Sequence, residues 1–203
     1  MTIPTRRLRV RGLAACATLL LFAAALGAQT SATPPQNSPQ SAPSSPSPDW
    51  KTYTYAPDGF SASFPSAPDV QKRNIATDAG SFELHSYIGQ VGEVAMFIGV
   101  VDYRSEAAGK DPDTLLQGAK NGALENSKSK LVSEKQITLG VYPGLTFEAE
   151  SDQAHFSVRF YMVGSTLYQM LVVYPLGKTY ADTARFLESF QLIARAQAER
   201  PAA

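Results

Sequence analysis

The chain has 203 residues, enough for one or two domains, and 44% of them are hydrophobic, so it can bury a core. Eighteen basic residues balance eighteen acidic ones, so no overall field attracts nucleic acid and no nucleic-acid partner is expected. The single cysteine excludes an intrachain disulfide and a four-cysteine zinc site, and the two histidines leave little for another metal centre.

Residues 1–28 have the pattern of a signal peptide. Four arginines precede an uncharged run rich in Ala and Leu, and small residues at its end fit cleavage after Gly27 or Ala28. Cys16 opens this run, whereas a lipobox cysteine follows one, so no lipid anchor is expected. The run is also shorter than the ~20 residues that span a bilayer. We therefore expect an extracytoplasmic protein, periplasmic or secreted, with no stable membrane span after cleavage.

Residues 29–48 have the composition of a linker. They contain six prolines, six serines, no charged residue and nothing apolar larger than Ala. Such a segment is typical of an extended, disordered spacer, because it has no apolar surface to bury. It suits a tether to a membrane or wall as well as it suits the tail of a freely exported domain. The folded domain is expected at 49–194, with a disordered tail at 195–203.

Short runs of aromatic and β-branched residues predict strands in the first half of the domain. Residues 50–55 and 60–64 flank Pro57-Asp58-Gly59, which is typical of a hairpin turn. Three further strands are predicted over 70–76, 82–88 and 94–103. The first eight residues of the last one carry no polar side chain, which indicates a strand covered on both faces.

Two helices are predicted among the later strands. Asp111 followed by Pro112 begins one that reaches about Asn126, with its leucines and alanines on one face. A strand over 131–139 and a turn over 140–144 follow. Thr179 and Asp182 form a capping-box-like start for the second helix, which directs apolar side chains as far as Ile193 toward the core.

Two consecutive hairpins between residues 145 and 174 predict one register. A turn at Gly164-Ser165 and another near Asp152-Gln153 both place the same residues on one apolar face. On that face the expected pairs are Met162 with Leu167, Val158 with Leu171, Phe156 with Val173, Phe147 with Val158, and Ala149 with Phe156. On the other face they are Tyr161 with Tyr168, Arg159 with Met170, His155 with Tyr174, and Glu150 with His155, with Glu148 diagonal to Arg159. Val158→Asp is therefore expected to cost several kcal/mol, and Ser157→Asp much less.

Three segments of the domain resemble exported bacterial proteins of the PsbP-like superfamily. They are residues 60–68, residues 159–170 and residues 186–192, with the sequences FSASFPSAP, RFYMVGSTLYQM and FLESFQL. The resemblance implies an α+β fold, in which an antiparallel sheet has helices packed on both faces, an α/β/α sandwich. The superfamily includes an extrinsic photosystem II subunit and a nuclear-import regulator that binds the GTPase Ran. The photosystem role is not implied, because the Pro and Trp typical of that subunit are replaced around Phe64, Pro65 and Pro68.

Motifs for catalysis or cofactor binding are missing from the sequence, which has no GxSxG elbow, HExxH pair, P-loop or dinucleotide fingerprint. What remains is the predicted cluster of Glu148, Glu150, His155 and Arg159. One interpretation is a site for an anionic ligand or for proton transfer. The favoured one is cross-strand charge pairing on a partly solvated face.

Aromatic side chains share the face of this cluster. Tyr161, Tyr168 and Tyr174 are either the floor of a binding site beside Arg159 or, as we favour, the seat of the second helix. A second alternation, Glu83, His85 and Tyr87, is interpreted as a solvated strand face.

The sequence thus favours an exported, non-catalytic binding or accessory module of the cell envelope. Its candidate binding face comprises Glu148, Glu150, His155, Arg159, Tyr161 and Tyr168, and its partner is another envelope protein or a small ligand. No cofactor is expected. The alternative is a small extracytoplasmic hydrolase or isomerase that uses His155 and Glu150.

Overall fold

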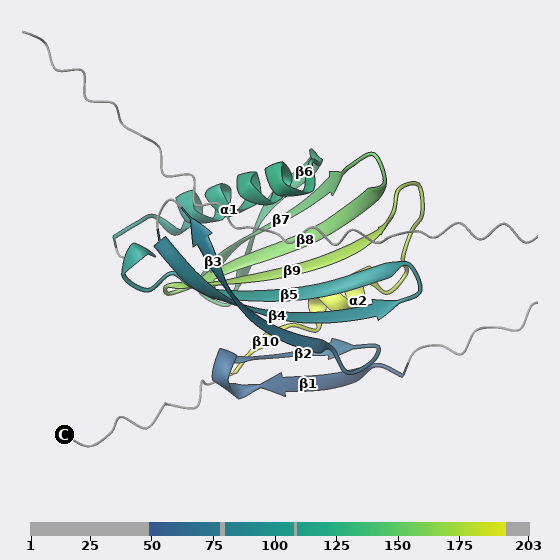
Figure 1. Cartoon of the computed structure of the whole chain (residues 1–203), viewed down its shortest axis with the longest axis horizontal. Coiled ribbons are helices and arrows are strands. Elements are labelled where there is room, and N and C mark those ends of the chain that lie inside the picture. Colours follow the sequence, from purple (N-terminus) through teal and green to yellow (C-terminus); the bar gives the residue numbers. More distant parts are fainter. Residues whose placement is uncertain (1–48, 78–79, 108, 194–203) are drawn as a thin grey trace, which may run out of the picture.

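The computed structural model describes residues 49–77, 80–107 and 109–193. The predicted signal peptide, linker and C-terminal tail lie outside these residues. The described residues form two antiparallel sheets, here called the large sheet and the small sheet, together with two α-helices and two short 3₁₀ helices (Figure 1).

The large sheet has seven strands in the order β3-β4-β5-β9-β8-β7-β6. Each strand pairs antiparallel with its neighbours, so consecutive hairpins build most of the sheet. The strands are β3 (Asp69–Thr77), β4 (Gly80–Val91), β5 (Val94–Asp102), β6 (Lys130–Leu139), β7 (Tyr142–Glu150), β8 (Ala154–Val163) and β9 (Thr166–Pro175). The strands predicted for this sheet are present, with β5 and β9 at its centre.

The small sheet has the order β1-β2-β10 and forms the lower layer in Figure 1. Its strands are β1 (Lys51–Tyr55), β2 (Phe60–Phe64) and β10 (Gln191–Leu192), and the 3₁₀ helix η1 (Ala56–Asp58) joins the first two. Gly59 follows η1 with φ of 73°, a left-handed conformation that glycine adopts at no steric cost. The predicted hairpin is present, but its separation from the large sheet was not expected.

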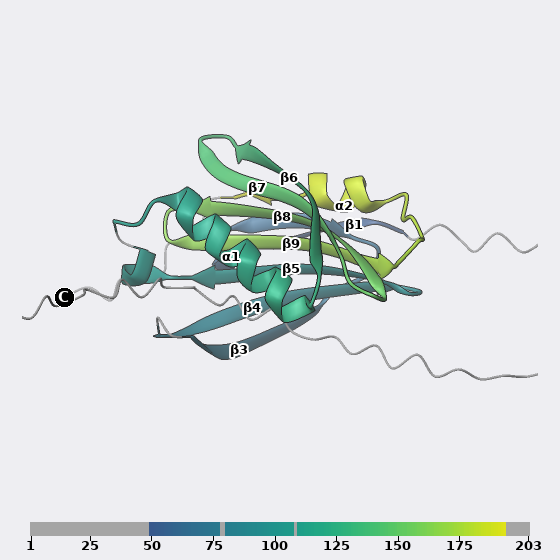
Figure 2. The same cartoon turned by 90° about the horizontal axis from the view of Figure 1, so that it is seen from above.

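The two helices are unequal. Helix α1 (Pro112–Ser127) begins as predicted, because the Asp111 carboxylate accepts a hydrogen bond from the Thr114 backbone N–H at 3.0 Å. Figure 2 shows α1 running obliquely to the strands of the large sheet. The second 3₁₀ helix, η2 (Arg104–Ala107), lies between β5 and α1.

Helix α2 (Thr183–Glu188) is shorter than predicted. The capping box at Thr179 is absent, since Asp182 is the N-cap residue and its side chain makes no capping bond. The helix also stops well before Ile193. The Ser189 hydroxyl donates to the Phe186 carbonyl and accepts from the Ser63 backbone N–H at 2.9 Å, which ties the chain to β2. The next residues then pair with β2 as β10.

The register predicted for the two hairpins is confirmed. The observed pairs include Phe147 with Val158, Glu150 with His155, Val158 with Leu171, and Tyr161 with Tyr168. The predicted turn at 140–144 is too long, because β7 already begins at Tyr142. Gly144 lies inside β7, where any Cβ would overlap the Tyr161 ring and the Phe160 carbonyl, so this glycine permits close packing and makes no turn.

Two hydrophobic cores lie on opposite faces of the large sheet. One packs beneath α1 and contains Phe147, Val158, Phe160 and Leu171. The other lies between the large sheet, the small sheet and α2, and contains Phe60, Tyr168, Met170 and Phe186. The α+β fold is therefore mostly antiparallel sheet, and one of its outer layers combines a short helix with three strands.

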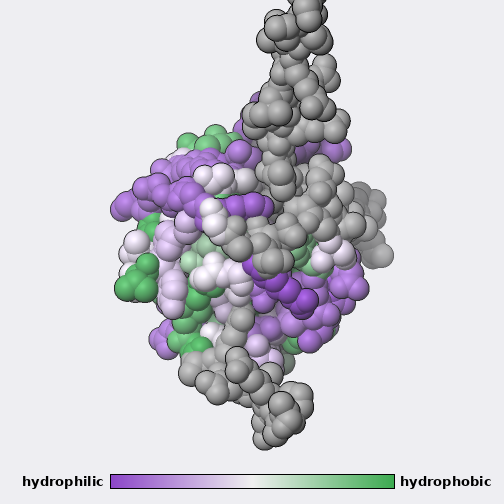
Figure 3. All heavy atoms as spheres, turned by 90° about the vertical axis from the view of Figure 1, so that its left-hand side faces the viewer, coloured by the Kyte–Doolittle hydropathy of each residue, from purple (hydrophilic) through white to green (hydrophobic). Residues whose placement is uncertain are grey.

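The surface is mixed in character. Figure 3 shows hydrophobic residues interspersed among hydrophilic ones on the side of the molecule that it displays. The large apolar side chains exposed among the described residues are Val70, Leu131, Val132, Val141 and Leu176, which come from both edges of the large sheet and from turns. Such dispersed apolar residues are normal on a soluble surface.

Candidate functional site

The predicted cluster around His155 forms where β7 ends and β8 begins. The His155 Nδ1 atom lies 3.1 Å from a Glu150 oxygen, and its Nε2 atom lies 2.8 Å from Glu148 Oε2. The Ser157 hydroxyl donates to the same Glu148 oxygen at 2.6 Å. Tyr174 stacks on the imidazole, with 4.9 Å between the ring centroids. The His155 ring is thus fixed by two carboxylates, one at each nitrogen, and by Tyr174 stacked on one of its faces.

Water reaches part of this cluster. The side chains of His155, Glu148 and Glu150 are 19%, 36% and 44% exposed. Ser157, by contrast, is only 2% exposed. The premise that position 157 is solvated is therefore wrong, and Ser157→Asp is now also expected to be costly, since a new carboxylate would be buried against Glu148.

Arg159 departs from the predicted cluster. It is two residues from Ser157 along β8, and its guanidinium donates to the Leu187 carbonyl at 3.4 Å and lies 3.6 Å from Glu188. The structure thus pairs Arg159 with α2 and not with Glu148. The physical reason is that α2 packs directly over this stretch of β8 and presents its last carbonyls to the nearest cation.

The two predicted site tyrosines are buried and do not form an accessible binding face. Tyr161 stacks on Phe190 with 6.2 Å between the ring centroids, and Tyr168 packs against the same ring in a tilted arrangement at 5.4 Å. The Tyr168 hydroxyl also donates to the Asp58 carbonyl at 2.7 Å. Burial raises the pKa of Tyr161 above its usual value, although nearby Arg159 opposes this shift. The interpretation of the three tyrosines as the seat of the second helix therefore holds only in part. Tyr161 and Tyr168 lie against Phe190, just beyond the end of α2, whereas Tyr174 stacks on His155.

The arrangement around His155 does not suit base catalysis. A general base needs a ring nitrogen that can accept a proton from the substrate, but both nitrogens of His155 face carboxylates. A serine nucleophile would have to donate to the histidine, but the Ser157 hydroxyl donates to Glu148. The geometry therefore favours charge pairing over the catalytic alternative.

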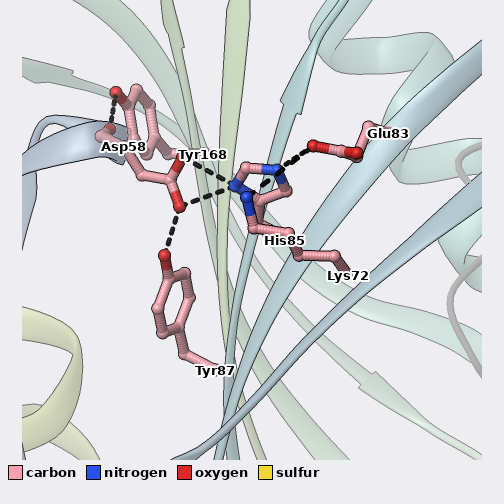
Figure 4. A network of polar contacts seen from close by, with 6 residues as sticks. All are labelled: Asp58, Lys72, Glu83, His85, Tyr87 and Tyr168. Carbon is pink, nitrogen blue, oxygen red and sulfur yellow. Dashed lines mark hydrogen bonds and ion pairs between the residues drawn. The ribbon is translucent and has the colours of Figure 1, made fainter.

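A second histidine cluster, which the sequence analysis missed, joins the two sheets (Figure 4). The His85 Nδ1 atom lies 2.7 Å and 2.8 Å from the two carboxylate oxygens of Asp58. The His85 Nε2 atom contacts Glu83, whose carboxylate also lies 3.9 Å from Lys72. The Tyr87 hydroxyl donates to Asp58 from the other side.

The Asp58 end of this cluster is buried and the Glu83 end is exposed. Asp58 is 7% exposed, whereas the Glu83 side chain is 51% exposed. Burial raises the pKa of Tyr87 far above its usual value, and the hydrogen bond to Asp58 adds to this effect. The hydrogen bond from His85 lowers the pKa of the Glu83 carboxyl, with smaller contributions from Lys72 and Arg104.

The interpretation of Glu83, His85 and Tyr87 as a solvated face is thus wrong for Tyr87, which is buried, and incomplete for His85. One local feature of the sequence could have indicated this burial: Tyr87 lies two residues after His85, on the same strand face. A buried tyrosine usually needs a hydrogen-bond partner for its hydroxyl. That partner, Asp58, lies in the predicted turn, 27 residues earlier than His85.

Neither cluster has the geometry of a metal site. Within residues 49–77, 80–107 and 109–193, no three His, Cys, Asp or Glu side chains converge on one point. In both clusters the carboxylates contact opposite nitrogens of one imidazole, so a single ion cannot reach all three groups.

An apolar pocket lies between the end of α1 and the large sheet, on the face away from both histidines. Its walls include Leu124, Phe156 and Val158, and its polar members are the hydroxyls of Ser127 and Ser129, which bond each other at 2.6 Å. This pocket holds no charged side chain. Among the described residues, no helix has the length and hydropathy needed to cross a membrane.

Comparison with known proteins identifies the fold. No protein family model matches the chain, and no curated protein matches it. Among solved structures, the solution structure of cyanobacterial PsbP (CyanoP) from Synechocystis sp. PCC 6803 is similar, with a TM-score of 0.51 and 10% identity. The match covers 71% of this chain and 93% of that one. Likeness at this identity concerns architecture alone, and on that basis the chain has a PsbP-like fold.

Proposed function

We propose that this chain is an exported, non-catalytic binding or accessory module of the cell envelope. Its contact surface is the His155 rim, defined here as Glu148, Glu150, His155, Arg159 and Glu188. The observation that carries the proposal is that these partly exposed charges are fixed by mutual contacts on the paired strands β7 and β8 and on α2.

Rigid charges suit recognition because little side-chain entropy is lost when a partner binds. His155 is held at both nitrogens and stacked on Tyr174, so it fixes Glu148 and Glu150 in turn. Three carboxylates share the rim with one arginine and one histidine. This balance favours an envelope protein that presents lysine or arginine side chains.

Export rests on the sequence of residues 1–28, which has the pattern of a cleavable signal peptide. The Pro/Ser-rich residues 29–48 would then give the domain its reach from a membrane or wall. Intact-mass measurement of the protein from its native host tests this part. Cleavage near residue 27 or 28 is expected, and a mature protein that retains Met1 to Ala28 would overturn it.

Binding is tested by quantitative co-purification of the full-length chain from the envelope fraction of its native host. Glu150→Ala and Arg159→Ala, each first shown to be folded by circular dichroism, should weaken retention of a shared partner about fivefold or more. Glu93→Ala is the matched control, because Glu93 is exposed in the turn between β4 and β5. A partner retained equally by all four proteins would place the contact surface elsewhere.

A further inference from the structure

We propose that Asp58, His85 and Glu83 form a pH-sensitive latch that fastens the small sheet to the large sheet. The latch is closed while the His85 ring carries a proton on both nitrogens, and it loosens when the ring loses one. This inference concerns the body of the fold and is independent of the function proposed for the His155 rim.

The latch spans the two sheets because its members come from different layers. Asp58 ends η1, the link between β1 and β2, whereas Glu83 and His85 lie on β4. Around Asp58, hydrogen bonds also come from Tyr87 on β4 and from Tyr168 on β9. Asp58, in the link between two strands of the small sheet, is thus hydrogen-bonded to three side chains of the large sheet (Figure 4).

The protonation requirement follows from hydrogen-bond chemistry. Ionised carboxylates only accept hydrogen bonds, and an imidazole has two N–H donors only in its protonated form. His85 faces Asp58 with Nδ1 and Glu83 with Nε2. Loss of one proton therefore leaves a ring lone pair directed at one of the two carboxylates, and that contact becomes repulsive. Whichever nitrogen keeps its proton, the hydrogen bond to Asp58 is either lost or no longer strengthened by a charge on the imidazole.

The neighbouring groups keep their charge states while a histidine titrates, between about pH 5 and 8. Burial raises the pKa values of Tyr87 and of Tyr55 on β1, so these phenols stay neutral, and Tyr168 is likewise a phenol. Lys72 on β3 and Arg104 at the start of η2 remain cationic beside Glu83. Contact with His85 lowers the pKa of Glu83, so it remains ionised. These neighbours therefore supply no change of charge that would mask a response of the latch.

Release of Asp58 would uncover aromatic surface. Tyr87 lies 4.1 Å from the ring of Tyr55 and 4.9 Å from the ring of Phe60, both on the small sheet. These rings cover one another while β1 and β2 stay packed on the large sheet. A loosened latch would therefore first be seen as faster opening of β1, η1 and β2.

His155 is an internal control for the latch. Its two carboxylates lie on β7, the strand paired with its own strand β8, so deprotonation of its ring has no second layer to release. The chain has two histidines, which makes both rings resolvable in a nitrogen-15 side-chain spectrum. His155→Gln assigns the two sets of signals.

The test follows both imidazoles and the backbone amides of the full chain by NMR from about pH 5.5 to about pH 8.5. We expect both nitrogens of His85 to bear protons at the acid end and one to lose its proton as pH rises. Over the same interval, exchange protection in β1 and β2 should fall about tenfold, the equivalent of one charge-assisted hydrogen bond. Protection in β7 and β8 should change much less.

Glu83→Gln sharpens the test without disturbing the buried carboxylate. Glu83 is half exposed, so this variant should fold, and its His85 ring should lose the proton at lower pH than in the wild type. The pH at which β1 and β2 lose exchange protection should fall by the same amount. The proposal fails if His85 keeps one state throughout, or if β1 and β2 lose no more protection than β7 and β8.

Discussion

His85 and His155 lie in clusters of similar composition, and their positions in the fold make them different. Each imidazole lies between two carboxylates and near a tyrosine. The partners of His155 are five and seven residues away, on one hairpin. The Asp58 partner of His85 is 27 residues away, in the link between β1 and β2 of the small sheet.

Similar contacts therefore contribute differently to the free energy of unfolding, depending on how deeply they are buried. Exposed ion pairs contribute about 0 to 1 kcal/mol, because water screens the charges and competes for them. Removing one partner of a buried pair costs about 3–5 kcal/mol, because a charge is left without compensation. The Asp58 carboxylate is buried and contacts two side chains, whereas the Glu150 carboxylate is partly exposed and contacts one.

The largest expected effect is that of Asp58→Ala. The substitution leaves the buried Tyr87 hydroxyl and the His85 ring without their acceptor, so the free energy of unfolding should fall by roughly 3 kcal/mol. Urea melts measure this loss at about pH 6, within the range where histidines titrate. A cost below that of Glu150→Ala would break the contrast between the two clusters.

A smaller effect is expected from Tyr168→Phe. The ring remains in the core against Phe190, and the buried Asp58 carbonyl loses the hydrogen bond that it accepts at 2.7 Å. The free energy of unfolding should fall by about 1 to 2 kcal/mol. Tyr174→Phe, near His155, is the matched control in the same urea series and should stay close to the wild type. If both variants lose the same free energy of unfolding, the hydrogen bond from Tyr168 to the Asp58 carbonyl does not contribute to stability.

Glu150→Gln should have a slight effect. The side chain keeps an oxygen that can accept from His155, and the original pair is partly exposed, so a change of no more than about 0.5 kcal/mol is expected. High salt should reduce even that difference, because screening acts on exposed charges. A loss of several kcal/mol would show that the His155 rim is as important to the fold as the Asp58 contact.

The smallest effect concerns the exposed end of the latch at acid pH. The pKa of Glu83 is lowered in the folded chain, so its contribution to stability is present above the usual carboxyl range and is lost as pH falls through the folded value. Thermal melts of the wild type should therefore decline slightly more than those of Glu83→Gln between about pH 5 and about pH 3. Parallel declines would contradict the assigned direction.

Local pattern was sufficient to predict strands β1 to β9, helix α1 and the register of the β7–β8–β9 hairpins. Alternation of apolar side chains and turn residues such as Gly164 act over a few positions, so both can be read directly. The Glu150 contact with His155 followed from that register. The direction of Arg159 did not, because its partners belong to α2.

The sequence by itself therefore determined helix α1, strands β1 to β9, the antiparallel pairing of neighbouring strands and the contact of Glu150 with His155. Only the tertiary structure decided that β10 completes a separate small sheet, that Tyr161 and Tyr168 are buried, and that Asp58 reaches His85. Each of these outcomes depends on two layers packing face to face. Such packing brings together residues that are distant along the chain, through burial and hydrogen bonding. Local periodicity predicts which face of a strand is buried, but it does not predict which distant segment will cover that face.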